Sequence, residues 1–328
     1  MRARLDAGRG GLLARITLVK ALLAAGDTAA ALAQAREAVS LNPNIAPAVL
    51  ALGEALLAAD LLPTAIAELQ RALRLDPDLS RARELIAGAW LKAGEADKAL
   101  EALGALDDPP AAMIAAAEAI KTAPRSDPGY VRHLFDQFSA DYDSRMIGQL
   151  GYAAPQILLD LAAMVMAGRD GLAILDLGCG TGLAGRAFRP FAARLDGIDL
   201  SPAMVEKARA RNIYDSLAVA DLETALSAPG PAYDLILAAD TLVYLGDLST
   251  VFAAAHARLH PDGFFLFTVE MADREGFELG PKRRWRHSET FLRDLAERVG
   301  FQVAGLVAAT PRHEAGVPVA GFAVALVR

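Results

Sequence analysis

The stretch "ILDLGCGTGLAG", residues 174–185, decides the fold of the C-terminal half of the chain. An apolar run leads into four glycines, at 178, 180, 182 and 185. Glycine permits backbone conformations and close approaches that other residues forbid, and a glycine-rich turn between a strand and a helix presents amide groups to a polar ligand. The stretch therefore predicts a strand over 172–177, then a ligand-binding loop, then a helix.

Further β-rich apolar runs follow at 194–199, 216–220, 233–239 and 263–269, with helical segments between them. Strands that alternate with helices predict a parallel sheet covered on both faces. Ligands of such sheets bind beyond the carboxyl ends of the strands. We therefore expect a Rossmann-like α/β domain with its site at those ends.

Carboxylates at the strand ends distinguish between two ligands of the glycine loop. The spacing of the last three glycines also fits the GxGxxG pattern of dinucleotide-binding folds. Asp176, however, would repel a pyrophosphate and attract an ammonium or sulfonium group. Asp199 ends the second run, where a carboxylate accepts hydrogen bonds from ribose hydroxyls, and Asp221 ends the third, within reach of an adenine amino group. This order favours S-adenosyl-L-methionine as the cofactor.

Five segments resemble, in the same order, the motifs of class I S-adenosylmethionine-dependent methyltransferases: "LDLGCGTG", "GIDLSPAMVEKAR", "ADLE", "YDLILAADTLVYLGD" and "LHPDGFFLFTVE". The resemblance covers about 130–328 and implies a mostly parallel seven-stranded sheet. "LFDQFSADYD" at 134–143 is similar to the helix that opens the domain in the ubiquinone and biotin-pathway type, whose aromatic and acidic residues close over the cofactor. "RRWRHSETFLRDLAERVGF" resembles a segment of predicted methyltransferases that carry tetratricopeptide repeats.

The resemblance implies which residues bind the cofactor. Asp176 and the glycine loop would hold the methionine part, Asp199 the ribose and Asp221 the adenine. Leu200 and Met204 would lie beside the nucleoside, although ordinary core packing explains these two equally well. The full set is Asp176, Gly178, Gly180, Gly182, Asp199, Leu200, Met204, Asp221 and Leu222. Cys179 has no evident base beside it, so we expect a small tolerated side chain rather than a nucleophile.

On the acceptor side we expect Tyr142, Asp240 and His287, with His287 as the first choice and Asp240 as a positioning residue. The run "PKRRWRHS" at 281–288 has two interpretations, a solvated face or a rim that binds an anionic acceptor, beside which Trp285 would stack on a flat molecule. Because a sulfonium already activates the methyl group, catalysis would consist mainly of alignment. We expect methylation of an oxygen or nitrogen of a small molecule, without a metal.

The N-terminal part shows a 34-residue period. "LNPN" at 41–44 recurs as "LDPD" at 75–78, and Ala31, Ala65 and Ala99 share the spacing. Such a period indicates stacked helix-turn-helix units, and these segments resemble tetratricopeptide repeats at about 12–45, 46–79 and 80–110. We expect an all-α solenoid over 1–123, a linker over 124–129 with the sequence "PRSDPG", and the methyltransferase domain over 130–328.

The role of the repeats stays open between four alternatives. They would bind a protein partner or a second copy, or read a protein or carrier-bound substrate, or belong to a non-catalytic scaffold that binds S-adenosylmethionine, or serve as an alanine-rich helical spacer. A net charge of −7 without a basic cluster argues against nucleic acid as a partner. Without an apolar stretch of spanning length or a recognisable signal peptide, and with a single cysteine, we expect a cytoplasmic protein.

Overall fold

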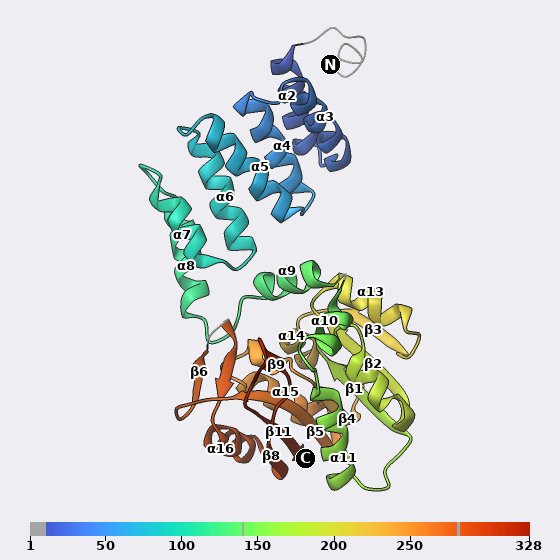
Figure 1. Cartoon of the computed structure of the whole chain (residues 1–328). Helices are drawn as coiled ribbons and strands as arrows, with labels where there is room; N and C mark the ends of the chain where they lie inside the picture. The colour runs from blue at the N-terminus through green and yellow to red at the C-terminus, as the bar shows by residue number, and fades with distance from the viewer. Residues whose placement is uncertain (1–10, 140, 281–282) are drawn as a thin grey trace. The chain divides into compact units, whose positions relative to one another are not determined.

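The computed structural model describes residues 11–139, 141–280 and 283–328. The chain divides into two compact units, Met1–Thr122 and Ala123–Arg328 (Figure 1). The first is helical, and the second contains the sheet. Among the described helices, none combines the length and the apolar character that crossing a bilayer requires.

The first unit consists of helices in an antiparallel series. They are α2 (Leu12–Ala24), α3 (Thr28–Leu41), α4 (Ala46–Ala58), α5 (Leu62–Leu75), α6 (Ser80–Lys92), α7 (Ala96–Gly104) and α8 (Ala111–Thr122). Helices α2, α4 and α6 begin 34 residues apart, and so do α3, α5 and α7. The expected all-helical region and its period are confirmed.

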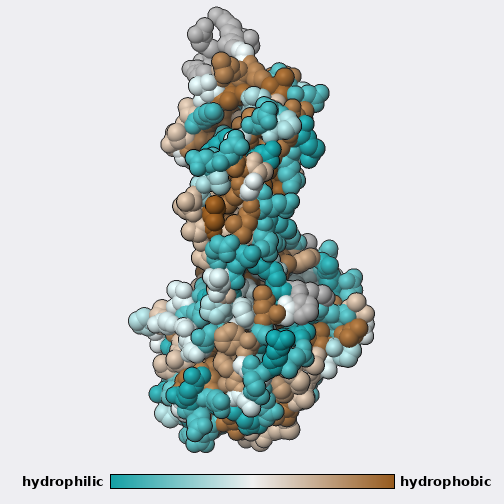
Figure 2. Space-filling model, turned by 90° about the vertical axis from the view of Figure 1, so that its left-hand side faces the viewer, coloured by the Kyte–Doolittle hydropathy of each residue, from teal (hydrophilic) through white to brown (hydrophobic). Residues whose placement is uncertain are grey.

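The period arises from small residues at helix contacts and from repeated turns. Ala31, Ala65 and Ala99 are fully buried. Helices α4 and α5 approach so closely that a Cβ on Gly53 would lie 2.5 Å from the Leu69 side chain. Each turn within a pair contains a residue of positive φ, at Gly26 (77°), Asp60 (58°) and Gly94 (66°). Figure 2 shows apolar surface between polar regions on the viewed face of this unit.

The second unit is built on a mixed sheet. Its main strands are β1 (Leu172–Leu177), β2 (Ala192–Asp199), β3 (Ser216–Val219), β4 (Tyr233–Ala238), β5 (Leu259–Met271), β8 (Gln302–Ala309) and β11 (Gly321–Val327). Their order is β3-β2-β1-β4-β5-β11-β8, and β11 runs antiparallel to both of its neighbours. This confirms the Rossmann-like fold with a seven-strand core.

Two apolar layers cover the sheet. One contains α15 (Ser249–Arg258) and α16 (Glu289–Val299), and the other contains α11 (Ala154–Val165) and α12 (Leu183–Phe188). The smaller elements are α9 (Pro128–Phe138), α10 (Tyr142–Gly148), α13 (Pro202–Ala210), α14 (Leu222–Ser227), β6 (Phe277–Leu279), β7 (Trp285–His287), β9 (His313–Glu314) and β10 (Val317–Pro318). Strand β7 pairs in parallel with the last two residues of β5, and β6 pairs antiparallel with β7.

The segment expected to be a linker is bound to the second unit. The Pro124 carbonyl accepts hydrogen bonds from the amides of Gly246 (2.9 Å) and Asp247 (3.0 Å), and the Ser126 amide donates to the Tyr244 carbonyl (2.8 Å). The Ser126 side chain is buried. Residues 124–129 thus begin the second unit, while the exact domain boundaries stay a prediction.

The turn at Gly26 provides a stability test. Gly26→Ala should lower the melting temperature of the helical unit, because at φ 77° an L-residue costs about 1 kcal/mol although the space around the site is open. Gly104→Ala, also in open space but at the end of α7 without positive φ, should leave it unchanged or slightly higher. Thermal unfolding followed by circular dichroism compares them, and equal effects would contradict the turn assignment.

Trypsin tests the state of residues 124–129. Cleavage should be faster after Lys121, whose side chain is exposed and lies near the end of α8, than after Arg125, which two carboxylates hold. Backbone that is hydrogen-bonded into a folded unit resists proteolysis. Mass spectrometry of early digestion products gives the order. Preferential cleavage after Arg125 would show that this segment is a free linker.

Candidate cofactor and acceptor site

The glycine loop after β1 leaves room for a ligand at one position. Gly178, Gly180 and Gly182 have φ of 64°, 54° and 92°. A Cβ on Gly178 would collide with Thr241, whereas a Cβ on Gly180 would meet nothing within 4 Å. Gly182 precedes α12 as its N-cap. The conformation of the loop therefore depends on its glycines, and the space beside Gly180 is free for a ligand.

Asp199 fastens this loop to the end of β2. Its carboxylate accepts hydrogen bonds from the amides of Gly180 and Ser201, both at 2.8 Å. Burial raises the pKa of Asp199, and the two amide hydrogen bonds oppose this shift. Since a carboxylate has about four acceptor sites, Asp199 keeps capacity for a further donor.

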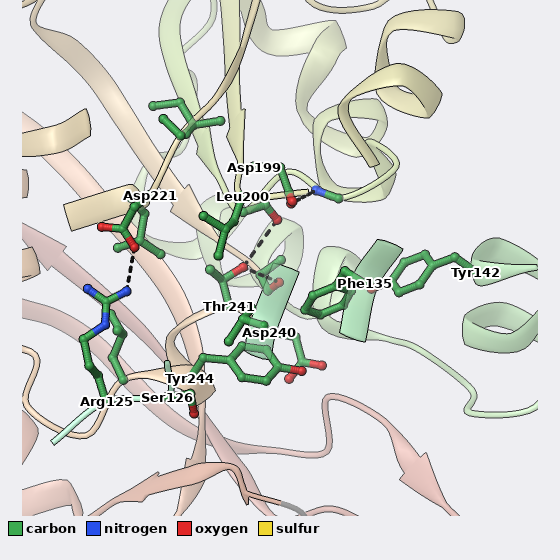
Figure 3. A pocket seen from close by; sticks show the side chains of 18 residues that line it. Arg125, Ser126, Phe135, Tyr142, Asp199, Leu200, Asp221, Asp240, Thr241 and Tyr244 are labelled. Carbon is green, nitrogen blue, oxygen red and sulfur yellow. Dashed lines mark hydrogen bonds and ion pairs between the residues drawn. The ribbon is translucent and has the colours of Figure 1, made fainter. Parts of the chain in front are cut away.

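A cavity lies at the carboxyl ends of β1, β2, β3 and β4, and encloses about 680 Å³ including its open mouth. Figure 3 shows Asp199, Asp221, Asp240, Tyr142 and Tyr244 around it. The expected residues in its wall are Tyr142, Gly178, Gly180, Asp199, Leu200, Asp221, Leu222 and Asp240. The structure therefore brings most of the expected set to one space.

Three expected cofactor residues lie outside this wall. Gly182 is two residues beyond Gly180, the last loop residue that lines the cavity, and Met204 is fully buried, as core packing requires. Asp176 is also fully buried: Tyr214 donates to its Oδ2 (2.7 Å), and its Oδ1 has no partner. Burial raises the pKa of Asp176 to about 6, against the lowering effect of the Tyr214 hydrogen bond.

Arg125 lies beside Asp221 in the cavity wall, a position that the sequence did not indicate. Its guanidinium pairs with Asp221 at 2.6 Å (Figure 3) and with Glu223. Burial raises the pKa of Asp221. The hydrogen bond and the charge of Arg125 lower this pKa by a larger amount, so the net shift is downward. No local pattern indicates this pair, because its members are 96 residues apart in the sequence.

Helices α9 (128–138) and α10 (142–148) form what we call the cover segment. Ser201 donates to Asp136 of α9 (2.5 Å), and Thr181 of the glycine loop donates to Asp143 of α10 (2.5 Å). Arg211 also pairs with Asp143. The cover segment is thus fastened directly to the glycine loop and to the loop after β2.

A second cavity of about 1370 Å³, including its mouth, adjoins the first. Four residues line both cavities: Phe135, Tyr142, Asp240 and Tyr244. The Phe135 ring meets Tyr142 and Tyr244 edge-on, with centroid distances of 6.1 and 5.6 Å. We call this meeting point the junction.

Asp240 is held at the junction by a buried ionic cluster. Its backbone has φ 56°, a rare conformation for a non-glycine residue. Arg312, fully buried, pairs with Asp240, Glu270 and Glu314. Burial raises the pKa of Asp240, and Arg312 opposes this shift. In the described chain, no group of three or more His, Cys, Asp and Glu side chains is arranged to hold a metal ion.

His287 is placed away from both cavities, which corrects its expected position on the acceptor side. It is fully buried, with Nε2 3.0 Å from the Gly246 carbonyl and its ring stacked on Phe291. Burial lowers its pKa to about 4. Trp285 packs against Phe277 and lines neither cavity. Of the basic run, Arg283 and Arg284 line the second cavity, and Lys282 lies outside the described residues.

Comparison with known proteins agrees with this geometry. A family model described as "Methyltransferase domain" matches residues 175–265. Human methyltransferase-like protein 27 is 35% identical over 108 residues, which are 32% of this chain and 44% of that protein. A trans-aconitate 2-methyltransferase of Paracidovorax citrulli is 34% identical over 102 residues, 30% of this chain and 38% of that protein. The chain thus spans less than half the length of these relatives.

A solved structure agrees with the fold over a longer part of the chain. The [4+2]-cyclase SpnF superposes with a TM-score of 0.51 and 20% sequence identity, and the alignment covers 63% of this chain and 98% of that one. At this identity the likeness concerns the fold alone. Fold, glycine loop and family match agree. Residues 175–265 thus match a methyltransferase domain in sequence, and they lie within a Rossmann-like unit, a fold that binds S-adenosyl-L-methionine in such domains.

Proposed function

We propose that this protein transfers the methyl group of S-adenosylmethionine to an oxygen or nitrogen atom of a small molecule. One observation carries the proposal: the cavity at the strand ends adjoins a second and larger cavity, and the four residues of the junction line both. Ligands of doubly wound sheets bind at these strand ends. The second cavity then receives the methyl acceptor.

The chain's own residues fit the cofactor. Asp176 lies outside the cavity wall, but its buried carboxylate, with Oδ1 unpartnered, would favour the ammonium group of the methionine part through its negative charge. The open side of Gly180 lets the ligand approach the backbone. Asp199 would accept hydrogen bonds from the ribose, and Asp221, oriented by Arg125, would bind the adenine between Leu200 and Leu222.

The cofactor supplies a methyl group already activated by its sulfonium centre. What the protein contributes is alignment, which is worth up to about 7–11 kcal/mol in favourable systems. Burial raises the pKa of Tyr142 far above its usual range, so its hydroxyl stays protonated and orients the acceptor as a donor. Asp240, bound to Arg312, acts as a positioning residue.

We propose that the N-terminal unit consists of tetratricopeptide repeats that bind a protein partner or a second copy, in the cytoplasm. The 34-residue recurrence of helix starts and the buried alanines support this assignment. The alternative, in which the repeats read a protein or carrier-bound acceptor, is distinguished by comparing turnover of the full chain with that of residues 123–328. Equal turnover of a free small acceptor favours the first role.

Catalysis itself is tested by release of S-adenosylhomocysteine from a panel of acids, phenols and amines. The trans-aconitate 2-methyltransferase relative makes organic acids the first choice. The similarity of fold to a [4+2]-cyclase makes the test necessary, because a shared fold is compatible with different reactions. Cofactor binding without product from any acceptor would favour a non-catalytic scaffold.

Asp199→Ala should weaken S-adenosylmethionine binding by about 10- to 150-fold, because hydrogen bonds to a charged group are worth about 1.5–3 kcal/mol. Isothermal titration calorimetry measures it. Asp196→Ala is the matched control: Asp196 is on the same strand and equally buried, but it pairs with Arg194 and Tyr233 and lies outside the cavity. Equal affinity in Asp199→Ala and the natural protein would contradict the assignment.

Cofactor affinity should also depend on pH through Asp176. With its pKa at about 6, Asp176 is ionised at pH 7 and protonated below pH 6, so affinity for an ammonium group should fall by up to about tenfold between pH 7 and pH 5. Tyr214→Phe removes the hydrogen bond that lowers this pKa and should move the fall to higher pH. Asp176→Asn should abolish this fall in affinity between pH 7 and pH 5 in calorimetric titrations. An unchanged dependence of affinity on pH in that variant would refute the role of Asp176.

A further inference from the structure

The second cavity has a mostly apolar wall. Side chains from the cover segment supply much of it, namely Leu134, Phe135, Phe138 and Met146, and Leu150 follows shortly after α10. Phe138 is 38% exposed, which is high for a large aromatic side chain. An apolar cavity with a few polar groups is typical of a small-molecule site, so the body of the acceptor should be apolar and planar or bulky.

Two arginines of this wall lie on aromatic rings. The Arg145 guanidinium lies 4.7 Å from the centre of the Phe138 ring, and that of Arg283 lies 4.6 Å from the centre of the Tyr130 ring. A guanidinium that stacks on a ring keeps its N–H groups at its edge, in the plane where carboxylates and phosphates bind. Both rings and both arginines line the same cavity.

Arg145 differs from Arg284, another cation of the cavity wall. Arg284 pairs with Glu314 and Glu270, and its charge is balanced by the ionic cluster. For Arg145, no carboxylate of the described chain lies within ion-pair distance. An unbalanced guanidinium above an exposed phenylalanine ring, at a cavity wall, is suited to an anionic group of a ligand.

The position of Arg145 separates this anion from the reacting atom. Tyr142 and Arg145 are three residues apart in α10, a rise of about 4.5 Å. Tyr142 lines both cavities, whereas Arg145 lines the second only. A group held by Arg145 would therefore lie in the second cavity and outside the first, which leaves a different atom of the same molecule to face the cofactor.

We propose that the methyl acceptor is an apolar molecule with two polar ends: an anionic group, carboxylate or phosphate, bound by Arg145, and a separate oxygen or nitrogen nucleophile at the junction. Arg145 is then a specificity-determining residue on the cover segment. This inference rests on the proposed function, because it assigns the second cavity to the acceptor.

Fluorescence titration of the full chain, saturated with S-adenosylhomocysteine, tests the proposal with three naphthalene probes. Hydroxynaphthoate and hydroxynaphthyl phosphate carry an anion opposite a hydroxyl, and naphthalenediol has the same ring without the anion. At least one anionic probe should bind about tenfold more tightly than the diol. The preferred anion tells carboxylate from phosphate.

Arg145→Gln should reduce this preference to within about threefold, and Arg145→Lys should retain part of it, because lysine keeps the charge without the fork of donors. Arg169→Gln is the matched control: Arg169 also lies over a phenylalanine, Phe264, at 5.1 Å, but outside the second cavity. It should keep the full preference.

Absence of any preference in the natural protein, or its persistence in Arg145→Gln, would overturn the inference. Calorimetric binding of S-adenosylhomocysteine to each variant separates this failure from a broader one. If the natural protein binds S-adenosylhomocysteine normally but shows no preference for the anionic probes, only the role of Arg145 is contradicted. Failure of the natural protein to bind S-adenosylhomocysteine would instead contradict the proposed function.

Discussion

The buried guanidinium of Arg312 is the contact on which the geometry of the junction depends. It joins Asp240 after β4, Glu270 near the end of β5 and Glu314 of β9, three segments distant in sequence. Buried charges are tolerated only when they are paired, and removal of one partner of such a pair typically costs about 3–5 kcal/mol. The cluster thus fixes the positive-φ backbone at Asp240 and with it one side of both cavities.

The sheet was predictable because its strands carry local signals. The run 172–177 coincides with β1, and those at 194–199, 216–220 and 233–239 fall within two residues of β2, β3 and β4 at each end. The fifth strand is longer than expected, Leu259–Met271, because its pairing with β4 begins already at Leu259. The number of core strands, seven, followed from the family resemblance rather than from these runs.

The site residues were predictable where they stand at the end of a strand. They were not predictable where a side chain comes from a segment distant in sequence. Asp199 and Asp240 were placed correctly in the cavity wall, since strand ends define it. Arg125 and Arg312 were missed because they meet their partners across 96 and 72 residues. His287 follows a basic run that suggested a ligand, but its position on β7 beneath Phe277 and Phe291 makes it part of the core.

The cover segment touches both ligand sites and the loops between them. Phe135 and Tyr142 belong to both walls, and Asp136 and Asp143 bind the loops that hold the cofactor. Because these two helices contact both cavities, a ligand in one cavity that shifts them would change the affinity for a ligand in the other. Such coupling is reciprocal: a cofactor that alters acceptor affinity by some factor has its own affinity altered by the acceptor by the same factor. The acceptor would then bind with different affinity to the protein that holds S-adenosylmethionine and to the protein that holds S-adenosylhomocysteine.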